Sequence, residues 1–143
     1  MAENILIVDD ELDMLELLEL IITDRTDYRV ITTSEPQKAT QLLREQPVDL
    51  VITDLRMPEM DGLELIDKIK QWDDQIPFII ITAYGTMESA MEALRQGALD
   101  YITKPFRREQ ILLTIEKAMK WRRLLKENQA LKAELEAVKK THA

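Results

Sequence analysis

Two apolar runs of this sequence end in acidic side chains, and these ends are where the chain can carry chemistry. Residues Asn4–Val8 lead into Asp9 and Asp10, and residues Leu50–Thr53 lead into Asp54. Runs of this length and composition are typical of buried strands, and the Pro and Gly that follow Asp54 indicate a loop. Carboxylates gathered at the ends of two strands repel one another unless a cation lies between them. The first functional hypothesis is therefore a divalent metal beside a reactive carboxylate.

The elements that must position these acids alternate along the chain. Five apolar runs, at residues 4–8, 28–32, 50–53, 78–81 and 100–102, are separated by helical patterns. The second helix is predicted to begin with a capping box, Ser34-x-x-Gln37, with Pro36 in its first turn. This alternation, with strands that are apolar throughout, predicts an α/β fold in which helices cover both faces of a parallel sheet. The expected architecture is a doubly wound (βα)5 sheet of five strands.

The last predicted helix is unusually long and changes character along its length. No Pro or Gly occurs from Arg108 to about Lys140, whereas an average helix has roughly 11–12 residues. Its later apolar positions alternate in steps of three and four, the heptad pattern of a coiled coil. Trp121, Asn128 and Leu135 take the a positions, and Leu124, Leu131 and Val138 take the d positions. We expect a boundary between residues 1–118 and a helical segment, 119–143, that pairs with a second copy in a parallel homodimer.

Two further polar residues follow predicted strands, and they complete a chemically sensible set. Thr82 and Lys104 come after the fourth and fifth apolar runs, and ligands of open parallel sheets bind outside the carboxyl ends of the strands. Carboxylates suit Mg²⁺, and a carboxylate can act as a nucleophile that forms an aspartyl phosphate. Phosphoryl transfer needs positioning and neutralised oxygens, which Mg²⁺, an ammonium and a hydroxyl supply. The set predicts phosphorylation of Asp54.

Each of these residues also has an ordinary structural interpretation. Asp9, Asp10 and Glu11 could be acids at a helix N-terminus, stabilised by the helix dipole. Asp54 could cap a turn, and Lys104 before Pro105 could be a surface lysine. It is the joint occurrence at the ends of separate strands that favours the phosphoacceptor site.

These residues resemble a known family. The matching segments are Ile5-Leu6-Ile7-Val8-Asp9-Asp10, Asp54-Leu55-Arg56-Met57-Pro58, Met60-Asp61-Gly62, Thr82-Ala83-Tyr84-Gly85 and Asp100-Tyr101-Ile102-Thr103-Lys104-Pro105-Phe106. In order and spacing they resemble the receiver domain of two-component response regulators, over about residues 4–118. The resemblance implies a CheY-like, flavodoxin-like strand order of 2-1-3-4-5.

The resemblance also implies a role for each matched residue. Asp54 is expected to be the phosphoacceptor, supplied by a sensor histidine kinase in a phosphorelay. The expected Mg²⁺ ligands are Asp10, Asp54 and the backbone carbonyl of Arg56, with Asp9 acting through water. Lys104 is expected to pair with the phosphoryl oxygens, Thr82 to turn inward, and Tyr101 to change rotamer with it. The Lys104–Pro105 bond resembles one that is cis in the family.

The tail resembles a narrower group. A receiver whose last helix continues as Trp121-Arg122-Arg123-Leu124-Leu125-Lys126-Glu127-Asn128 resembles regulators that activate the enhancer-dependent (sigma-54-type) sigma factor. In those proteins a linker leads to an ATPase domain and a DNA-binding domain. No Gly-x-x-x-x-Gly-Lys phosphate loop occurs in this sequence. We therefore expect a receiver-plus-linker fragment, with DNA contacted only through domains absent from this chain.

Two other functions compete with this hypothesis. The chain could be a stand-alone receiver that acts by protein binding, although the heptad tail argues against it. It could be an aspartyl-phosphate phosphatase, but such enzymes usually carry an Asp two residues after the nucleophile, where this chain has Arg56. Beyond self-catalysed phosphorylation and slow dephosphorylation, we expect no enzymatic activity.

Composition limits the remaining classes. The 143 residues include 19 basic and 27 acidic side chains, a net charge of −8 that disfavours direct nucleic-acid binding. The local basic run of Lys117, Lys120, Arg122, Arg123 and Lys126 is interpreted as a solvated coiled-coil face. The absence of cysteine excludes disulfides and thiolate metal sites. No apolar stretch reaches the roughly 20 residues that span a bilayer, and the N-terminus does not resemble a signal peptide. We expect a cytoplasmic protein without membrane contact.

Overall fold

The computed structural model describes residues 3–83 and 85–141, with side chains described as far as Ala137. Five parallel strands form one sheet in the order β2-β1-β3-β4-β5. The strands are β1 (Asn4–Val8), β2 (Arg29–Thr33), β3 (Leu50–Thr53), β4 (Phe78–Thr82) and β5 (Asp100–Thr103), and the helices are α1 (Leu12–Arg25), α2 (Pro36–Glu45), α3 (Gly62–Trp72), α4 (Met87–Arg95) and α5 (Arg108–Thr141). The predicted fold class and strand order are confirmed, and each strand begins and ends within one residue of its prediction.

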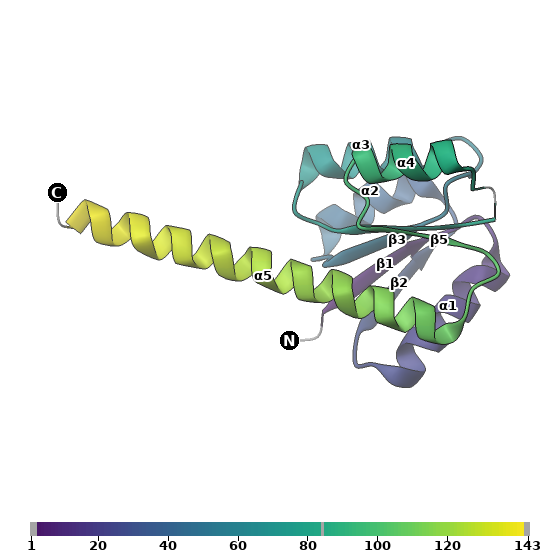
Figure 1. Cartoon of the computed structure of the whole chain (residues 1–143), viewed down its shortest axis with the longest axis horizontal. Helices are drawn as coiled ribbons and strands as arrows, with labels where there is room; N and C mark the ends of the chain where they lie inside the picture. Colours follow the sequence, from purple (N-terminus) through teal and green to yellow (C-terminus); the bar gives the residue numbers. More distant parts are fainter. Residues whose placement is uncertain (1–2, 84, 142–143) are drawn as a thin grey trace.

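The helices form two layers, one on each face of the sheet (Figure 1). Helices α2, α3 and α4 cover one face, where residues such as Leu65 and Phe78 make one core. Helices α1 and α5 cover the other, where Ile7, Leu18 and Ile115 belong to a second core. Strands β1, β3 and β4 are buried along their whole length because helices cover both of their faces. This rigid sheet holds the ends of its central strands in fixed positions.

The helix ends show where local sequence decided the structure and where it did not. Helix α3 begins as its sequence suggests, since the Asp61 side chain accepts the Glu64 N–H at 2.8 Å. The capping box predicted for α2 is wrong: Glu35 is the N-cap and its side chain makes no cap hydrogen bond. The Thr33 hydroxyl instead accepts the Glu35 N–H at 3.1 Å, which fixes the turn before the helix. Helix α4 ends before Gly97, where the backbone has φ of 102°.

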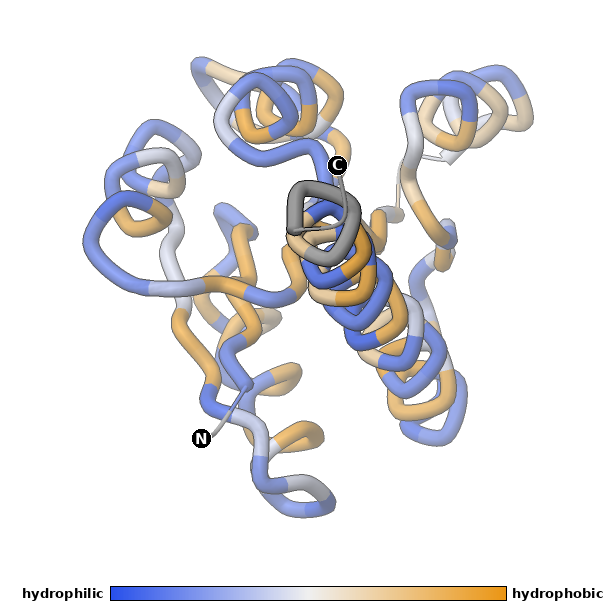
Figure 2. The backbone as a smooth tube through the Cα atoms, turned by 90° about the vertical axis from the view of Figure 1, so that its left-hand side faces the viewer, coloured by the Kyte–Doolittle hydropathy of each residue, from blue (hydrophilic) through white to orange (hydrophobic). Residues whose placement is uncertain are grey.

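Helix α5 has a part that packs on the sheet and a part that projects from the domain (Figures 1 and 2). Ile111, Ile115 and Met119 are almost completely buried against the second core. Farther along, apolar residues alternate with hydrophilic ones as the helix leaves the domain (Figure 2). The predicted long helix is therefore present. Among the described residues, no helix has the length and apolar character needed to cross a membrane.

Candidate functional site

Asp54 lies in the loop directly after β3, in the centre of the sheet. It is almost fully buried, with 2% of its surface exposed. Its backbone N–H donates to the Val8 carbonyl at 3.1 Å, so the β1–β3 pairing continues to the acid itself. Its carboxylate Oδ1 accepts the Arg56 N–H at 3.3 Å. A Cβ at Gly62 would lie 2.3 Å from the Asp54 carbonyl, so the loop can close behind this acid only with glycine there.

Asp9 and Lys104 complete the buried charges around Asp54. The Lys104 ammonium lies 3.1 Å from Asp54 Oδ2 and 3.2 Å from Asp9 Oδ2, and the lysine side chain is only 10% exposed. The chain reaches this position because the Lys104 N–H donates to the Thr82 carbonyl at 2.9 Å, extending the β4–β5 ladder. Three residues from three strand ends thus meet at one point, as the sequence predicted for the carboxyl edge of the sheet.

The electrostatics of this pocket are strained by an excess of carboxylate. Burial raises the pKa of Asp9, and the charge of Asp54 adds to it, although the Glu11 N–H and Lys104 act in the opposite direction. Burial alone would lower the pKa of Lys104, but the neighbouring charges of Asp9 and Asp54 outweigh it and raise that pKa. The lysine is therefore firmly cationic, while one cation faces two buried acids. Further positive charge would stabilise the ionised pocket.

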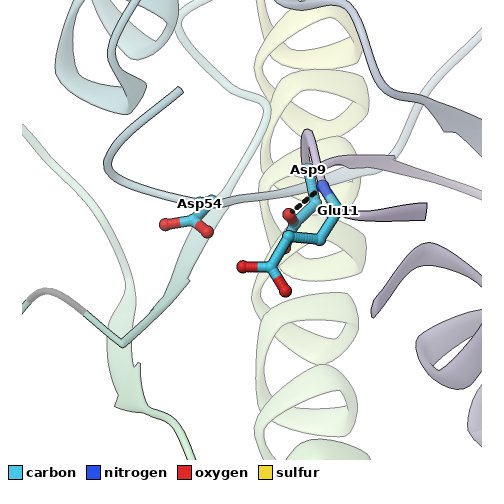
Figure 3. A group of neighbouring side chains, drawn as sticks. All are labelled: Asp9, Glu11 and Asp54. Carbon is cyan, nitrogen blue, oxygen red and sulfur yellow. Dashed lines mark hydrogen bonds between the residues drawn. The ribbon is translucent and has the colours of Figure 1, made fainter. Parts of the chain in front are cut away.

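The structure adds Glu11 to the predicted metal ligands and places Asp10 away from them. Oxygen atoms of Asp9, Glu11 and Asp54 all lie within 4.8 Å of one another (Figure 3). Glu11 also donates its N–H to Asp9 Oδ1 at 2.9 Å, which folds the loop before α1 over the pocket. Asp10 is exposed and borders a neighbouring hollow with Glu35 instead. Sequence reasoning named Glu11 in one acidic run with Asp9 and Asp10 but did not count it among the metal ligands.

The donor set fits a hard divalent cation. All ligand candidates in this cluster are carboxylate oxygens, the donor type that Mg²⁺ prefers, and two of the three residues are held rigidly by burial. Mg²⁺ usually retains several waters and needs only one or two protein carboxylates. Asp9, Asp54 and Glu11 are the residues that could hold it here, and the Arg56 carbonyl and Asp10 remain predictions.

The predicted switch residues occupy the neighbouring strands. Thr82, at the end of β4, is completely buried. Tyr101, in β5, is half-buried, and its hydroxyl lies 3.3 Å from the Ser89 hydroxyl in α4. Ser89 in turn forms a capping box with Thr86, the N-cap of α4, so Tyr101 contacts the N3 residue of that box. The Lys104–Pro105 bond is cis, as predicted. Tyr84 lies outside the described residues.

The predicted dimer residues lie on the projecting part of α5. Trp121, Leu124, Leu131 and Leu135 are all exposed large hydrophobic side chains, and Asn128 is also exposed. Val138 belongs to the helix, but its side chain lies outside the described part of the chain. A stripe of exposed leucines at heptad spacing is the pattern of an unpaired coiled-coil face. The pairing itself stays a prediction.

Known proteins share this arrangement. Residues 5–116 match the family described as the response regulator receiver domain. The chain belongs to this family. The transcriptional regulatory protein ZraR of Klebsiella oxytoca is 39% identical over 121 residues, which cover 85% of this chain and 27% of that protein. The chain thus spans about a quarter of the length of such curated relatives.

Solved structures of related receivers agree with the fold. NtrX from Brucella abortus, crystallised in complex with ADP, is 33% identical with a TM-score of 0.85, over 92% of this chain and 30% of that one. The beryllofluoride-activated NtrC4 receiver domain dimer, solved in solution, is 31% identical with a TM-score of 0.79, over 83% of this chain and 98% of that one. The receiver family predicted from the sequence is therefore confirmed, together with the relationship to transcriptional regulatory proteins.

Proposed function

We propose that this receiver is a phosphorylation-dependent switch in which Asp54 accepts a phosphoryl group. The observation that carries the proposal is the position of Lys104, whose ammonium lies 3.1 Å from a nearly buried Asp54 carboxylate. An isolated pair of one acid and one base carries no net charge. Here a second buried acid, Asp9, shares the same lysine, which leaves negative charge for a metal ion to neutralise.

The residues of the pocket would divide the work of phosphoryl transfer. A carboxylate oxygen of Asp54 attacks phosphorus, a P–O bond forms, and the P–N bond to a kinase phosphohistidine breaks with its electron pair leaving on the imidazole nitrogen. Lys104 moves from the Asp54 carboxylate to the transferred phosphoryl oxygens and neutralises them. Asp9 and Asp54, with Asp10, Glu11 and the Arg56 carbonyl as further candidates, would hold Mg²⁺. When bound, this ion supplies positive charge beside the phosphoryl oxygens.

The partner and the output follow from the receiver family. We propose a sensor histidine kinase as the phosphate donor, because receivers of two-component systems take phosphate from such kinases. We propose transcription regulation as the output, since relatives such as ZraR are transcriptional regulatory proteins. DNA would be contacted by domains outside this sequence. The seam of α5, residues 121–138, would pair two copies of the chain, and phosphate would change that dimer.

The route from the pocket to the surface runs through Thr82 and Tyr101. Thr82 would turn toward the phosphoryl group, and Tyr101 would fill the space that it leaves. In the present state the Tyr101 hydroxyl lies 3.3 Å from Ser89, a residue of the α4 capping box. A rotamer change at Tyr101 would remove that contact and loosen the start of α4, which gives the switch two states for phosphate to bias. We propose no enzymatic activity beyond self-catalysed phosphorylation and slow dephosphorylation.

Intact-mass spectrometry after treatment with a small acyl phosphate and Mg²⁺ tests this function. The wild-type chain is expected to gain the mass of one phosphoryl group, and Asp54→Asn is expected to gain none. Asp67→Asn makes the same chemical change at an exposed position of α3 and should be modified like wild type. An equal adduct on Asp54→Asn would refute the assignment of the phosphoacceptor.

A further inference from the structure

A second group of charges lies on α5, far along the chain from the phosphoacceptor pocket. Lys126 places its ammonium 2.7 Å from Asp49 Oδ1, and the Nε of Arg122 lies 3.8 Å from the same oxygen. Asp49 is only 5% exposed, and it comes directly before β3. Its other oxygen accepts the Asn4 N–H at 3.0 Å. One buried acid therefore joins the first residues of β1 and β3 to the projecting helix.

Arg122 and Arg123 extend this network to the neighbouring segments. Arg122 donates to the Gln75 carbonyl at 2.9 Å and lies 3.7 Å from Asp73, both in the loop between α3 and β4. The next residue, Arg123, lies 2.6 Å from Glu3. We call Arg122, Arg123 and Lys126, with their acceptors, the basal clamp.

The basal clamp also reaches β2. Arg123 donates to the Tyr28 hydroxyl at 3.1 Å, and that hydroxyl donates at 2.7 Å to Glu116, two turns earlier on the same face of α5. The clamp therefore contacts residues before β1, β2, β3 and β4. Because the strands are parallel, all these contacts lie at the amino-terminal edge of the sheet, opposite Asp54.

The clamp and the predicted coiled-coil seam use opposite faces of one helix. With Trp121 at position a and Leu124 at position d, the clamp residues Arg122, Arg123 and Lys126 take positions b, c and f. A helix turns about 100° per residue, so b, c and f face away from the a/d stripe. The structure agrees, because Trp121 and Leu124 are exposed while the Arg122 side chain is 11% exposed. The helix can thus bind its own domain and a second helix at the same time.

We propose that the basal clamp makes residues 119–126 part of the receiver body and fixes the direction in which α5 presents its seam. The receiver and the start of the linker then move as one rigid unit. The seam faces away from the domain, so a second copy of this chain can dock on it with both receivers held outside the helix pair. That a second copy binds the seam follows from the dimer proposed above. The clamp itself depends on neither the dimer nor phosphate.

Amide hydrogen exchange of the full chain tests the clamp. Asp49→Asn removes the charge but keeps an oxygen that can accept the Asn4 N–H, and Lys126→Met removes a cation from a half-exposed helix position. Exchange in residues 119–127 is expected to rise about tenfold in Asp49→Asn, because local opening no longer breaks an ion pair. Lys126→Met is expected to act in the same direction. Amides of β1 and β3 should change less than those of the helix segment.

Matched controls separate the clamp from general effects of charge. Asp74→Asn changes an exposed acid near Asp73, and Lys132→Met changes an exposed lysine on α5; neither has an ion pair among the described residues. Both should leave exchange in residues 119–127 unchanged. To prevent helix pairing from protecting these amides, all variants are also made with Leu131→Ser and Leu135→Ser. The clamp would be overturned if Asp49→Asn and Lys126→Met showed the same exchange in residues 119–127 as the two controls.

Discussion

The two ends of the sheet contain the same kinds of residue in opposite proportions. At the carboxyl edge, the two buried acids Asp9 and Asp54 share Lys104. At the amino edge, the basic residues Arg122 and Lys126 share one buried acid, Asp49. The difference appears in the acids themselves, since the pKa of Asp9 is raised and that of Asp49 is lowered.

The comparison separates a functional charge cluster from a structural one. An acid with a raised pKa destabilises the domain when it ionises, and a bound cation can relieve that cost. Burial of Asp49 alone would also raise its pKa, but Lys126, the Asn4 N–H and Arg122 outweigh burial and lower it. At the amino edge the charge of Asp49 is fully balanced by its basic neighbours, although the buried Nε of Arg122 has no hydrogen-bond partner among the described residues, whereas the carboxyl edge can still bind positive charge. Excess acid at the carboxyl edge thus supports the proposed switch.

The largest effect is expected from Lys104→Met. This substitution leaves Asp9 and Asp54 buried without their cation, and removing one partner of a buried ion pair costs about 3–5 kcal/mol. Without metal, chemical denaturation should show a loss of about 3 kcal/mol in the free energy of unfolding, and Mg²⁺ should restore part of it. Lys68→Met, at an exposed position of α3, serves as the control. If Lys104→Met lost no more unfolding free energy than that control, Lys104 would not be needed to neutralise the two buried acids.

The next largest effect concerns the seam of α5. Leu131→Ser with Leu135→Ser removes two apolar side chains per helix from the proposed interface, each worth about 1.5–3 kcal/mol when buried. Sedimentation should then show a dimer dissociation constant that is higher by at least about a hundredfold, while the receiver keeps its stability. The control, Gln129→Ser with Glu136→Ser, changes two exposed b positions that lie outside the seam. If the wild-type chain is monomeric at high micromolar concentration, with and without phosphate, the dimer is refuted.

A moderate and pH-dependent effect is expected for Asp49→Asn. Because the folded-state pKa of Asp49 lies below its ordinary value of 3.8, its contribution to stability is present above that value and is lost as pH falls through the folded pKa. The gap in unfolding free energy between wild type and variant should be about 2 kcal/mol near neutral pH and should close in acid. Denaturation curves from neutral pH downward measure this gap. A stability difference that widened in acid would contradict a lowered pKa of Asp49 in the folded state.

The smallest effect is expected for Tyr101→Phe. Among the described residues, the hydroxyl that this variant lacks forms one hydrogen-bond contact, at 3.3 Å to Ser89, and such a contact is worth about 1 kcal/mol or less. Amide exchange in the first turn of α4 should rise, while exchange in the central strands stays the same. Tyr28→Phe makes the same change at the amino edge and should leave α4 unaffected. Unchanged exchange throughout residues 83–96 in Tyr101→Phe would remove Ser89 from the proposed route.

The sequence predicted the carboxyl edge far better than the amino edge, for a physical reason. Strand periodicity placed Asp54, Thr82 and Lys104 at strand ends, and parallel strands bring such ends together. The clamp joins residues far apart in sequence, such as Asp49 and Lys126, and no local pattern indicates that pairing. The interpretation of the basic run as a solvated face is wrong for Arg122, and Arg123 and Lys126 are only partly exposed and also bind acids of the domain.

The predicted boundary after residue 118 also came from a local pattern, and it stays a prediction. Heptad spacing begins near that residue, so the pattern separates a linker from the domain there. The structure keeps the helix in contact with the domain through Lys126, because b, c and f side chains can bind the receiver without disturbing the heptad. The failed capping box at Ser34 is another local pattern that a neighbour overrode, since Thr33 satisfies the turn instead.

Unfolding free energies with and without Mg²⁺, in wild type, Asp9→Asn and Asp49→Asn, test the contrast between the two edges most directly. Without metal, Asp9→Asn should be as stable as wild type or more so, because ionised Asp9 is unfavourable above its raised pKa. Its stabilisation by Mg²⁺ should be smaller than that of wild type. Asp49→Asn should be less stable than wild type yet gain as much from Mg²⁺. A loss of metal-free stability in Asp9→Asn, with its Mg²⁺ response intact, would contradict the account.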